Sequence, residues 1–496
     1  MPEVWRDDQP LVSLAGDPWR IHDACEGTVI FGGTGSGKTS GSGQTVALSF
    51  LSAGFGGLVL CAKREEPDLW RRYAAQTNRT NDLIFFGSDP QTAFNFLEYE
   101  ARRPGEGAGL TENLVNLFLE VSSIGAGQGA TAGGDPFWER SMKSLIRNAI
   151  DLIQLAGSRL TLPAIFEVVQ SAPDLTGQAQ EAAWKEKSAC WRLLQDAEAN
   201  TIGTAAEADF RQVSGYWLRH FPGMGERTRG SIVAMFLSVA ESLMRGRMRE
   251  LFCEKSTVTP EDALRGKIIV VDLPVKEWSE VGRFSAVLWK YCLQKAVERR
   301  GDNADRLARP LFLWADECQH FISRYDQLFQ TTARAARAAT VYLTQNYPNL
   351  TAALGADPGG RSVVDSLLGN LGTKIFHANS DHETNRYAAD LIGRRLQTLR
   401  NSGTSGSLSG GGSLSLGSSR SHGISEHIDY SVQPAAFTTL RKGGLDNALR
   451  SEAYVFQSGR VWSSTRATWQ KVAFDQVARL RHESVPPPLP RLGRGR

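Results

Sequence analysis

The chain has 496 residues, more than one ordinary hydrophobic core holds, so we expect two domains. Hydrophobic residues make up 41% of the chain and charged residues 22%, which is typical of soluble globular proteins and excludes a wholly disordered chain. The net charge of +3 neither requires nor excludes a nucleic-acid partner, because a local basic patch can coexist with a balanced total.

The compartment that the sequence indicates is the cytoplasm. The first residues, Met1 to Asp8, lack the basic and then apolar pattern of a signal peptide. No run of about 18 apolar residues predicts a transmembrane helix. No two of the six cysteines lie within four residues of each other, so no zinc-ligand pair is visible and reduced thiols are expected.

The amino-terminal part alternates short apolar runs with helical patterns. Residues 28–31 are β-branched or aromatic and end at glycines, which predicts a buried strand, and residues 38–52 predict a helix after it. Residues 57–62 and 82–86 predict two further strands. Because strands that alternate with helices form parallel units, we expect a mostly parallel sheet flanked by helices.

The middle of the chain changes character. Glycine and alanine are frequent in residues 101–134, which predicts a flexible loop. From there to about residue 258 helical patterns follow one another, with long amphipathic stretches at 137–155 and 230–248. We therefore assign residues 1–137 and 259–483 to an α/β domain and residues 138–258 to an inserted all-α domain.

The α/β pattern resumes after the insertion. Further strands are predicted at residues 267–273, 311–315, 340–343, 374–376, 454–457 and 460–462, with a helix at 279–299. A Gly/Ser-rich tract at residues 401–422 predicts a flexible loop, and the Pro- and Arg-rich residues 484–496 predict a disordered tail.

One motif carries specific chemistry. It reads Gly32, Gly33, Thr34, Gly35, Ser36, Gly37, Lys38 and Thr39, and fits the phosphate-binding pattern G-x-x-x-x-G-K-[ST] between a strand and a helix. The glycines let backbone N–H groups point at a phosphate, and the helix start adds its positive dipole end. Lys38 would reach the β- and γ-phosphates, and the Thr39 hydroxyl would bind Mg²⁺. The chain is thus expected to bind and hydrolyse ATP with Mg²⁺.

Two adjacent acids follow the predicted strand 311–315. Asp316 would hold Mg²⁺ through water, and Glu317 would polarise the attacking water. The alternative is a strand that simply ends in solvent, where acids are common. The phosphate loop makes the catalytic interpretation the better one.

Two more candidates are less specific. Gln345 follows the predicted strand 340–343, where a side-chain amide could sense the γ-phosphate. Arg334 and Arg337 are three residues apart on a predicted helix and would share a face. We favour Arg334 as an arginine finger that acts on the nucleotide of a neighbouring subunit. The alternatives are an ordinary strand-end amide and a solvated basic face.

Beyond these motifs, the chain resembles the type IV coupling proteins, the TraG/TraD family of conjugation and type IV secretion ATPases. Residues 58–65 are similar to the second strand of that family, which ends in a Lys-Gly-Glu-like turn, with Arg64 here in place of the glycine. The resemblance includes several short segments and the Arg334-to-Gln345 spacing, over about residues 25–465. The segments are 94–97, 135–138, 370–376, 381–384 with Gly393, and 433–437.

The resemblance implies a RecA-like P-loop NTPase domain with an inserted all-α domain, assembled as a ring-shaped homohexamer with nucleotide between subunits. It also implies that DNA passes through the central channel and that the helical domain recognises a relaxase or another substrate protein. The basic residues that we consider for DNA contact are Arg394, Arg395, Arg400, Arg441, Lys442, Arg491, Arg494 and Arg496.

One departure concerns the membrane. Most members of the family have an amino-terminal anchor with two spanning helices, whereas here the phosphate loop begins about 30 residues into the sequence. Either an anchor has been removed, or a type IV secretion subunit supplies the contact with the inner membrane. Two other functions stay open: a HerA/FtsK-like DNA translocase in DNA processing or defence, and a nucleotide-dependent substrate adaptor.

Overall fold

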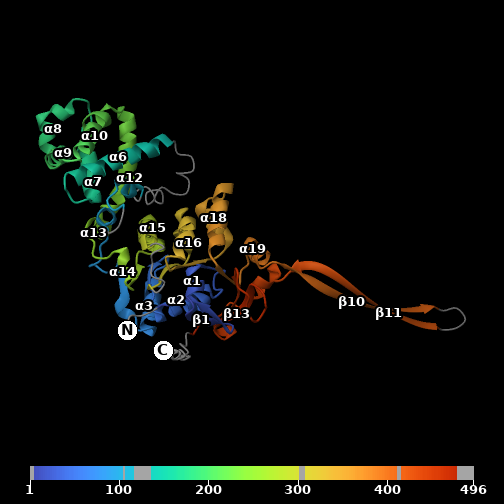
Figure 1. The fold of residues 1–496 in the computed structure, drawn as a ribbon. Helices are drawn as coiled ribbons and strands as arrows, with labels where there is room; N and C mark the ends of the chain where they lie inside the picture. Colours follow the sequence, from blue (N-terminus) through green and yellow to red (C-terminus); the bar gives the residue numbers. More distant parts are fainter. Residues whose placement is uncertain (1–4, 104–106, 117–135, 301–307, 410–414, 478–496) are drawn as a thin grey trace, which may run out of the picture.

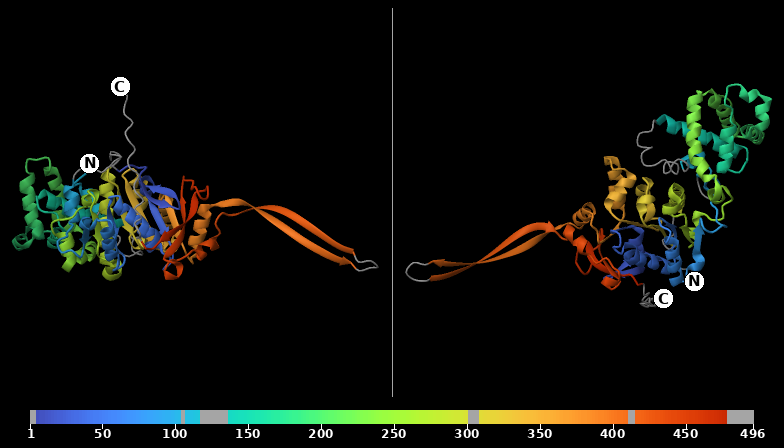
Figure 2. Two further views of the ribbon diagram at one scale, coloured as in Figure 1. Left: turned by 90° about the horizontal axis from the view of Figure 1, so that it is seen from below. Right: turned by 180° about the vertical axis from the view of Figure 1, so that it is seen from behind.

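The computed structural model describes residues 5–103, 107–116, 136–300, 308–409 and 415–477. These residues form an α/β body, a helical lobe and a long two-stranded ribbon (Figure 1). Both views of Figure 2 show the lobe and the ribbon extending from different sides of the body.

The body is built on a nine-stranded sheet with the order β13-β12-β9-β3-β8-β7-β4-β6-β5. The seven strands from β9 to β5 pair in parallel, whereas β12 and β13 are antiparallel and form one edge. The bounds are β3 Thr28–Phe31, β4 Gly56–Leu60, β5 Leu83–Phe86, β6 Ile268–Val271, β7 Leu311–Ala315, β8 Ala338–Thr344, β9 Thr373–His377, β12 Arg450–Gln457 and β13 Trp469–Asp475.

Helices cover both faces of this sheet, which explains why its central strands are apolar at consecutive positions. One face carries α1 (Ile21–Cys25), α2 (Gln44–Ser52) and α3 (Glu66–Gln76), and the other carries α15 (Val275–Arg300), α16 (Tyr325–Ala333) and α18 (Pro358–Asn370) (Figure 1). A separate hydrophobic cluster lies on each face. The expected mostly parallel α/β fold is confirmed.

The helical lobe comprises helices alone within its described residues, 136–253. They are α6 Pro136–Leu155, α7 Leu162–Ser171, α8 Ala182–Lys187, α9 Ala189–Thr201, α10 Glu207–Gly215, α11 Phe221–Gly223, α12 Glu226–Leu243 and α13 Gly246–Cys253. The chain enters the lobe after α4 (Phe96–Arg102) and returns to the sheet through α14 (Pro260–Leu264). Most of the loop expected at residues 101–134 lies outside the described residues.

The ribbon corrects one expectation. The Gly/Ser-rich tract predicted to be a loop forms much of two antiparallel strands, β10 (Arg394–Ser409) and β11 (Ser415–Tyr430). Their register runs from Arg394↔Tyr430 to Ser409↔Ser415. The composition was misleading because the hydrogen bonds between two strands join backbone groups, which serine and glycine also carry. The strand-forming residues at the base of the ribbon set its register.

A second correction concerns the edge of the sheet. Residues 460–462, predicted as a strand, lie outside the strands, and the partner of β12 is β13, which begins at Trp469. Trp462 is instead buried, and its Nε1 donates a hydrogen bond to the carbonyl oxygen of Thr468 (3.2 Å). An aromatic residue beside a valine is as typical of a buried loop as of a strand. Three residues are too few for the apolar pattern to distinguish the two.

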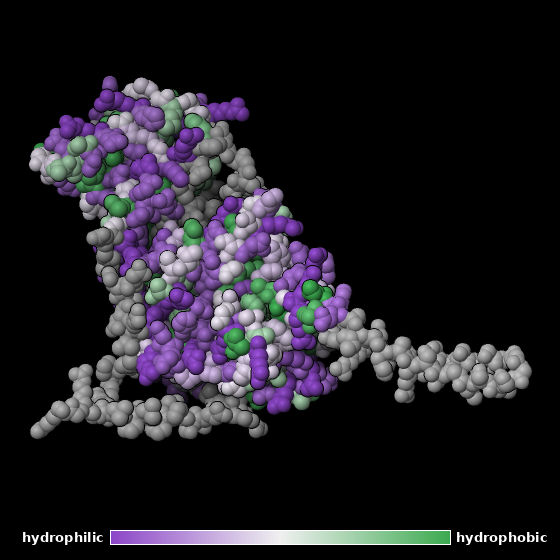
Figure 3. Space-filling view, turned by 45° about the vertical axis from the view of Figure 1, so that its right-hand side comes forward, coloured by the Kyte–Doolittle hydropathy of each residue, from purple (hydrophilic) through white to green (hydrophobic). Residues whose placement is uncertain are grey.

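In the ranges that the structure describes, no helix is long and apolar enough to cross a membrane. The face in Figure 3 is mostly hydrophilic, with scattered hydrophobic residues. All six cysteines are buried and free, as expected for reduced thiols.

A buried ion pair fixes the segment that follows the catalytic acids. Lys290 of α15 and Asp326 of α16 are each about 1% exposed and are in contact. Lys290 Nζ also donates a hydrogen bond to the carbonyl oxygen of Phe321 (2.6 Å). Gln294 Nε2 and the Tyr342 hydroxyl donate to Asp326 Oδ1, at 2.8 Å and 2.7 Å. The pair therefore joins α15, α16 and β8 beneath the loop 316–326.

Replacing Lys290 with methionine should lower the free energy of unfolding by about 3–5 kcal/mol, because the Asp326 carboxylate would stay buried without its cation. Urea denaturation measures this loss. Lys295→Met is the matched control on the same helix, because Lys295 is partly exposed and pairs with Glu298 at the surface. It should cost less than about 1 kcal/mol. Equal costs for the two variants would contradict the structural role of the buried pair.

Candidate active site

The phosphate loop begins where β3 ends, between β8 and β9. Gly32 N donates a hydrogen bond to the carbonyl oxygen of Thr344 (3.2 Å), and Gly33 N donates to that of Ala378 (3.0 Å). Each neighbouring strand thus holds one residue of the loop entrance. Because both contacts are made by backbone atoms, the sheet itself positions the loop.

Two glycines give the loop its curvature. Gly35 and Gly37 have φ of 72° and 87°, in the left-handed region that glycine alone adopts at little cost. A Cβ atom at Gly37 would also lie only 2.5 Å from Cβ of Ser451. A π-helical turn, Lys38–Gly43, follows and leads into α2. Such a turn directs successive N–H groups toward the loop, as an anion site requires.

The first contact among the predicted site residues joins this turn to the residue that follows β7. The Thr39 hydroxyl donates a hydrogen bond to Asp316 Oδ2 (2.7 Å). Asp316 is 3% exposed, and its Oδ1 accepts a hydrogen bond from the backbone N–H of Glu317 (2.9 Å). The structure therefore brings together the two residues that the sequence assigns to Mg²⁺.

The second contact surrounds Glu317 with positive charge. Its Oε1 lies 3.4 Å from Lys38 Nζ and 3.2 Å from Lys63 Nζ. Burial raises the pKa of Glu317, but the charge of Lys38, a hydrogen bond from Gln319 and the charge of Lys63 outweigh it and lower that pKa to about 2. The carboxylate is therefore ionised at neutral pH, as polarising a water molecule requires.

Glutamines complete this cluster. Gln319 Nε2 donates to Glu317 Oε2 (2.8 Å). Gln345 Nε2 lies 3.4 Å and 3.5 Å from the two carboxylate oxygens of Glu317. The backbone carbonyl oxygen of Gln345 accepts a hydrogen bond from Asn379 Nδ2 (2.7 Å). Gln345 is thus placed at the carboxyl ends of the strands beside the phosphate loop, where a group that senses the γ-phosphate would lie.

Sequence reasoning assigned no role to Lys63, although it follows β4 as Asp316 follows β7. The strand-end rule could have found it. Burial lowers the pKa of Lys63, but the charges of Asp316 and Glu317 more than compensate and raise it. Nearby, Glu66 is buried, and burial followed by the charge of Asp316 raises its pKa well above the ordinary value. Glu66 Oε2 accepts a hydrogen bond from the N–H of Ala62 (2.8 Å).

A buried histidine contacts the π-helical turn that follows the phosphate loop. His377, at the end of β9, has its Nε2 2.7 Å from the Ser42 hydroxyl, which itself donates to the Lys38 carbonyl (3.3 Å). Burial lowers the pKa of His377 to about 3, so the ring is neutral at pH 7. No sequence signal distinguished this histidine, because its contact with Ser42 spans 335 residues.

The arginine pair is not arranged as predicted. Arg334 is the residue that ends α16, whereas Arg337 has a φ of 56° and is buried, with Nη2 3.4 Å from Asp7 Oδ1. The two residues do not share a helix face, because the helix ends between them. The Arg334 side chain is 63% exposed, and its Nη1 lies 3.2 Å from Glu26 Oε1. Glu26 precedes β3, so Arg334 lies at the amino-terminal ends of the parallel strands. The phosphate loop lies at their carboxyl-terminal ends.

The basic candidates for DNA contact fall in different places. Arg394 lies at the base of the ribbon and contacts Tyr430. Lys442 lies beside the phosphate loop, since its carbonyl oxygen would be 3.1 Å from a Cβ atom at Gly37. Arg395 is exposed at the start of β10, and Arg441 is an exposed neighbour of Lys442. The side chain of Arg400 and the residues Arg491, Arg494 and Arg496 lie outside the described part.

The residues present fit a nucleotide with Mg²⁺. The Ser36 hydroxyl, in the loop, is buried and has no hydrogen-bond partner within the described structure, so a polar group is missing beside it. Among the described residues, no group of three or more His, Cys, Asp or Glu side chains could hold a metal ion by itself. The Thr39 hydroxyl and the Asp316 carboxylate are oxygen ligands of the kind that Mg²⁺ takes, together with phosphate oxygens and water.

Comparisons with known proteins agree with this geometry. Residues 310–429 match the family model described as the TraM recognition site of TraD and TraG. The match begins just before β7 and contains Asp316, Glu317, Arg334 and Gln345. Curated proteins give no significant match to the whole sequence.

Among solved structures, the fold is similar to that of a bacterial conjugative coupling protein, TrwB lacking its first 70 residues. The TM-score is 0.61 at 15% identity, covering 95% of this chain and 90% of that one. TrwB in complex with the ATP analogue ADPNP gives a TM-score of 0.60 at 15% identity, covering 96% and 92% of the two chains. The predicted resemblance to the type IV coupling proteins is thus confirmed, by the family model over residues 310–429 and by the fold over nearly the whole chain.

Proposed function

We propose that this chain is an ATP-hydrolysing coupling protein that recruits DNA, or DNA with a bound relaxase, and pumps it during conjugative transfer as a ring oligomer. The observation that carries the proposal is the contact of the phosphate loop with the acids after β7, through Thr39–Asp316 and Lys38–Glu317. These contacts support the proposal because they bring Lys38, Thr39, Asp316 and the ionised Glu317 into one cluster.

In this proposal each side chain has a separate task. The loop N–H groups and Lys38 bind the β- and γ-phosphates, while Thr39 and Asp316 hold Mg²⁺, which neutralises charge on the phosphates. When phosphates attract Lys38 away from Glu317, the carboxylate becomes available to polarise the attacking water. Gln345, already near Glu317, then helps to orient that water.

The solved relatives support the choice of nucleotide. TrwB has been solved with the ATP analogue ADPNP and with ADP and Mg²⁺. The same ligands suit this loop, because its strand, glycines, lysine and threonine have the expected arrangement. The family model that matches residues 310–429 is described as the TraM recognition site of TraD and TraG, which supports a protein partner in the transfer machinery.

Arg334 supports a ring. It is exposed and lies at the opposite edge of the sheet from its own phosphate loop, so it cannot reach the nucleotide of its own subunit. In a head-to-tail ring, that edge could face the phosphate loop of the next subunit, where a guanidinium would stabilise the charge that develops on the γ-phosphate.

The first test is Glu317→Gln. It should abolish steady-state ATP hydrolysis while leaving the binding of a fluorescent ATP analogue intact, because the amide keeps the size of the side chain but cannot polarise water. Glu65→Gln is the matched control and should keep normal turnover. Glu65 is an exposed glutamate that follows β4, at the same carboxyl-terminal side of the sheet as Glu317. Normal hydrolysis by Glu317→Gln would overturn the assignment of the base.

The second test is subunit mixing. Arg334→Ala and Glu317→Gln should each be inactive alone, but mixed rings should regain part of the activity. A site with Glu317 from the first variant and Arg334 from the second is complete. A mixture of Lys38→Ala with Glu317→Gln is the control and should stay inactive, because both residues act within one subunit. No recovery in the first mixture would refute a finger supplied by the neighbour.

A further inference from the structure

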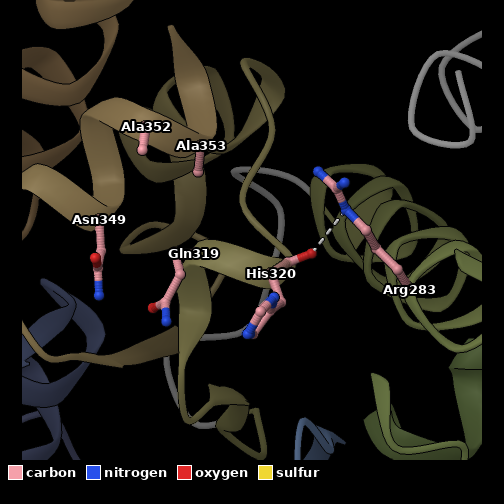
Figure 4. A pocket seen from close by; sticks show the side chains of 6 residues that line it. All are labelled: Arg283, Gln319, His320, Asn349, Ala352 and Ala353. Carbon is pink, nitrogen blue, oxygen red and sulfur yellow. Dashed lines mark hydrogen bonds between the residues drawn. The ribbon is translucent and has the colours of Figure 1, made fainter. Parts of the chain in front are cut away.

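A groove opens beside the catalytic cluster, between α15 and α17 (Tyr347–Leu354). Its volume is about 330 Å³. Figure 4 shows Asn349 and Arg283 on opposite sides, with Gln319 and His320 between them. Ala352 and Ala353 complete the lining. The small alanines leave space, and the other lining side chains can all donate hydrogen bonds.

The groove is connected to the catalytic residues in two ways. Gln319 faces it and donates a hydrogen bond to Glu317 Oε2 (2.8 Å). On the other side, α17 begins two residues after Gln345, and Asn349 lies in its first turn. The α17 side of the groove and its middle part, at Gln319 and His320, thus continue the segments that carry Gln345 and Glu317, whereas Arg283 comes from α15. A ligand in the groove would act directly on the position of the base.

Arg283 is the one charged side chain among the described residues that line the groove. Arg283 Nε donates to the carbonyl oxygen of His320 (3.1 Å), which fixes the guanidinium, and within the described chain no carboxylate pairs with Arg283. Burial lowers the pKa of His320, and the charges of Arg283, Lys276 and Lys63 lower it further against the opposing charge of Glu317. The Arg283 cation favours an anionic ligand, and the neutral imidazole of His320 can still donate a hydrogen bond to it.

An exposed aromatic side chain precedes Arg283 on the same helix. Trp278 is 40% exposed and lies between Lys276 and Arg283 in the sequence. The helix is kinked beside it at Ser279, with a φ of 48°, and a Cβ atom at Gly282 would lie 2.9 Å from Cβ of Trp278. Trp278 stands between Glu277 and Glu280 as well as between Lys276 and Arg283, and its exposed ring is a surface on which a base of a single-stranded nucleic acid can stack.

We propose that this groove binds the phosphate backbone of a nucleic-acid strand, with Arg283 as the principal contact, and that Gln319 transmits occupancy to Glu317. A strand that draws Gln319 toward its phosphates would remove one hydrogen bond from the carboxylate and so change its orientation. The inference rests on the proposed function, since it names where the strand would meet the ATPase site.

The binding test uses a fluorescein-labelled poly-dT 20-mer and the matching duplex, with anisotropy measured over a range of salt concentrations. Arg283→Gln should weaken binding several-fold and reduce the slope of log Kd against log salt by about 1, because one phosphate contact is lost. Arg72→Gln is the matched control, an exposed arginine on α3 at the opposite face of the sheet, and should change neither quantity. Equal slopes for both variants would overturn the site.

The coupling test measures ATP hydrolysis with and without the same strand. Arg283→Gln should keep the basal rate and lose most of the stimulation. Gln319→Ala should still bind the strand, with a loss of affinity no larger than that of Arg283→Gln because Arg283 is retained, yet its rate should no longer respond to the strand. If Gln319→Ala is stimulated like the wild type, the transmission through Gln319 is wrong.

Two outcomes separate this inference from the proposed function. If the wild-type protein neither binds the strand nor is stimulated by it, the DNA-pumping function itself fails. If the wild type responds and Arg283→Gln responds equally, only the groove assignment fails. A changed oligomeric state of Arg283→Gln in light scattering, with an unchanged salt slope, would instead identify the groove as a contact between copies of the chain.

Discussion

The site depends on one electrostatic arrangement, the Glu317 carboxylate held between two lysines. Lys38 comes from the phosphate loop after β3, and Lys63 comes from the turn after β4. In this buried setting an uncompensated carboxylate would be costly, so the two cations keep it charged without solvent. The same contacts join the phosphate loop, the turn after β4 and the residues after β7 at Glu317. In the proposed function, nucleotide phosphates would compete with Glu317 for Lys38.

The order of the strands makes this arrangement possible. β3 lies between β8 and β9, and β7 and β4 follow on the β8 side. Because all these strands are parallel, their carboxyl ends meet at one edge of the sheet. That edge receives the phosphate loop, the acids, Gln345 and Lys63. Arg334 lies at the opposite, amino-terminal ends of these strands, so in the proposed function it would act on the nucleotide of another subunit.

The segment after β7 connects the site with its surroundings. It starts at Asp316, passes Gln319 at the groove and ends at Asp326, which the buried Lys290 anchors. The catalytic end is held by charge that a nucleotide would alter, and the far end is fixed in the core. A segment that is anchored at one end and adjustable at the other is suited to carry a signal between a bound strand and the base.

The sequence by itself determined the phosphate loop, the acid pair and the mostly parallel sheet, because these depend on local patterns: glycines at fixed spacing, acids after an apolar run, and strands that alternate with helices. It also indicated the place of Gln345, since strand ends share an edge. Tertiary structure decided the rest. Lys63, His377 and the groove at Arg283 arise from residues far apart in the chain, and the helix end that separates Arg334 from Arg337 depends on the burial of Arg337. The Gly/Ser tract became a ribbon because a strand ladder is made by the backbone, whose pairing the composition of side chains does not reveal.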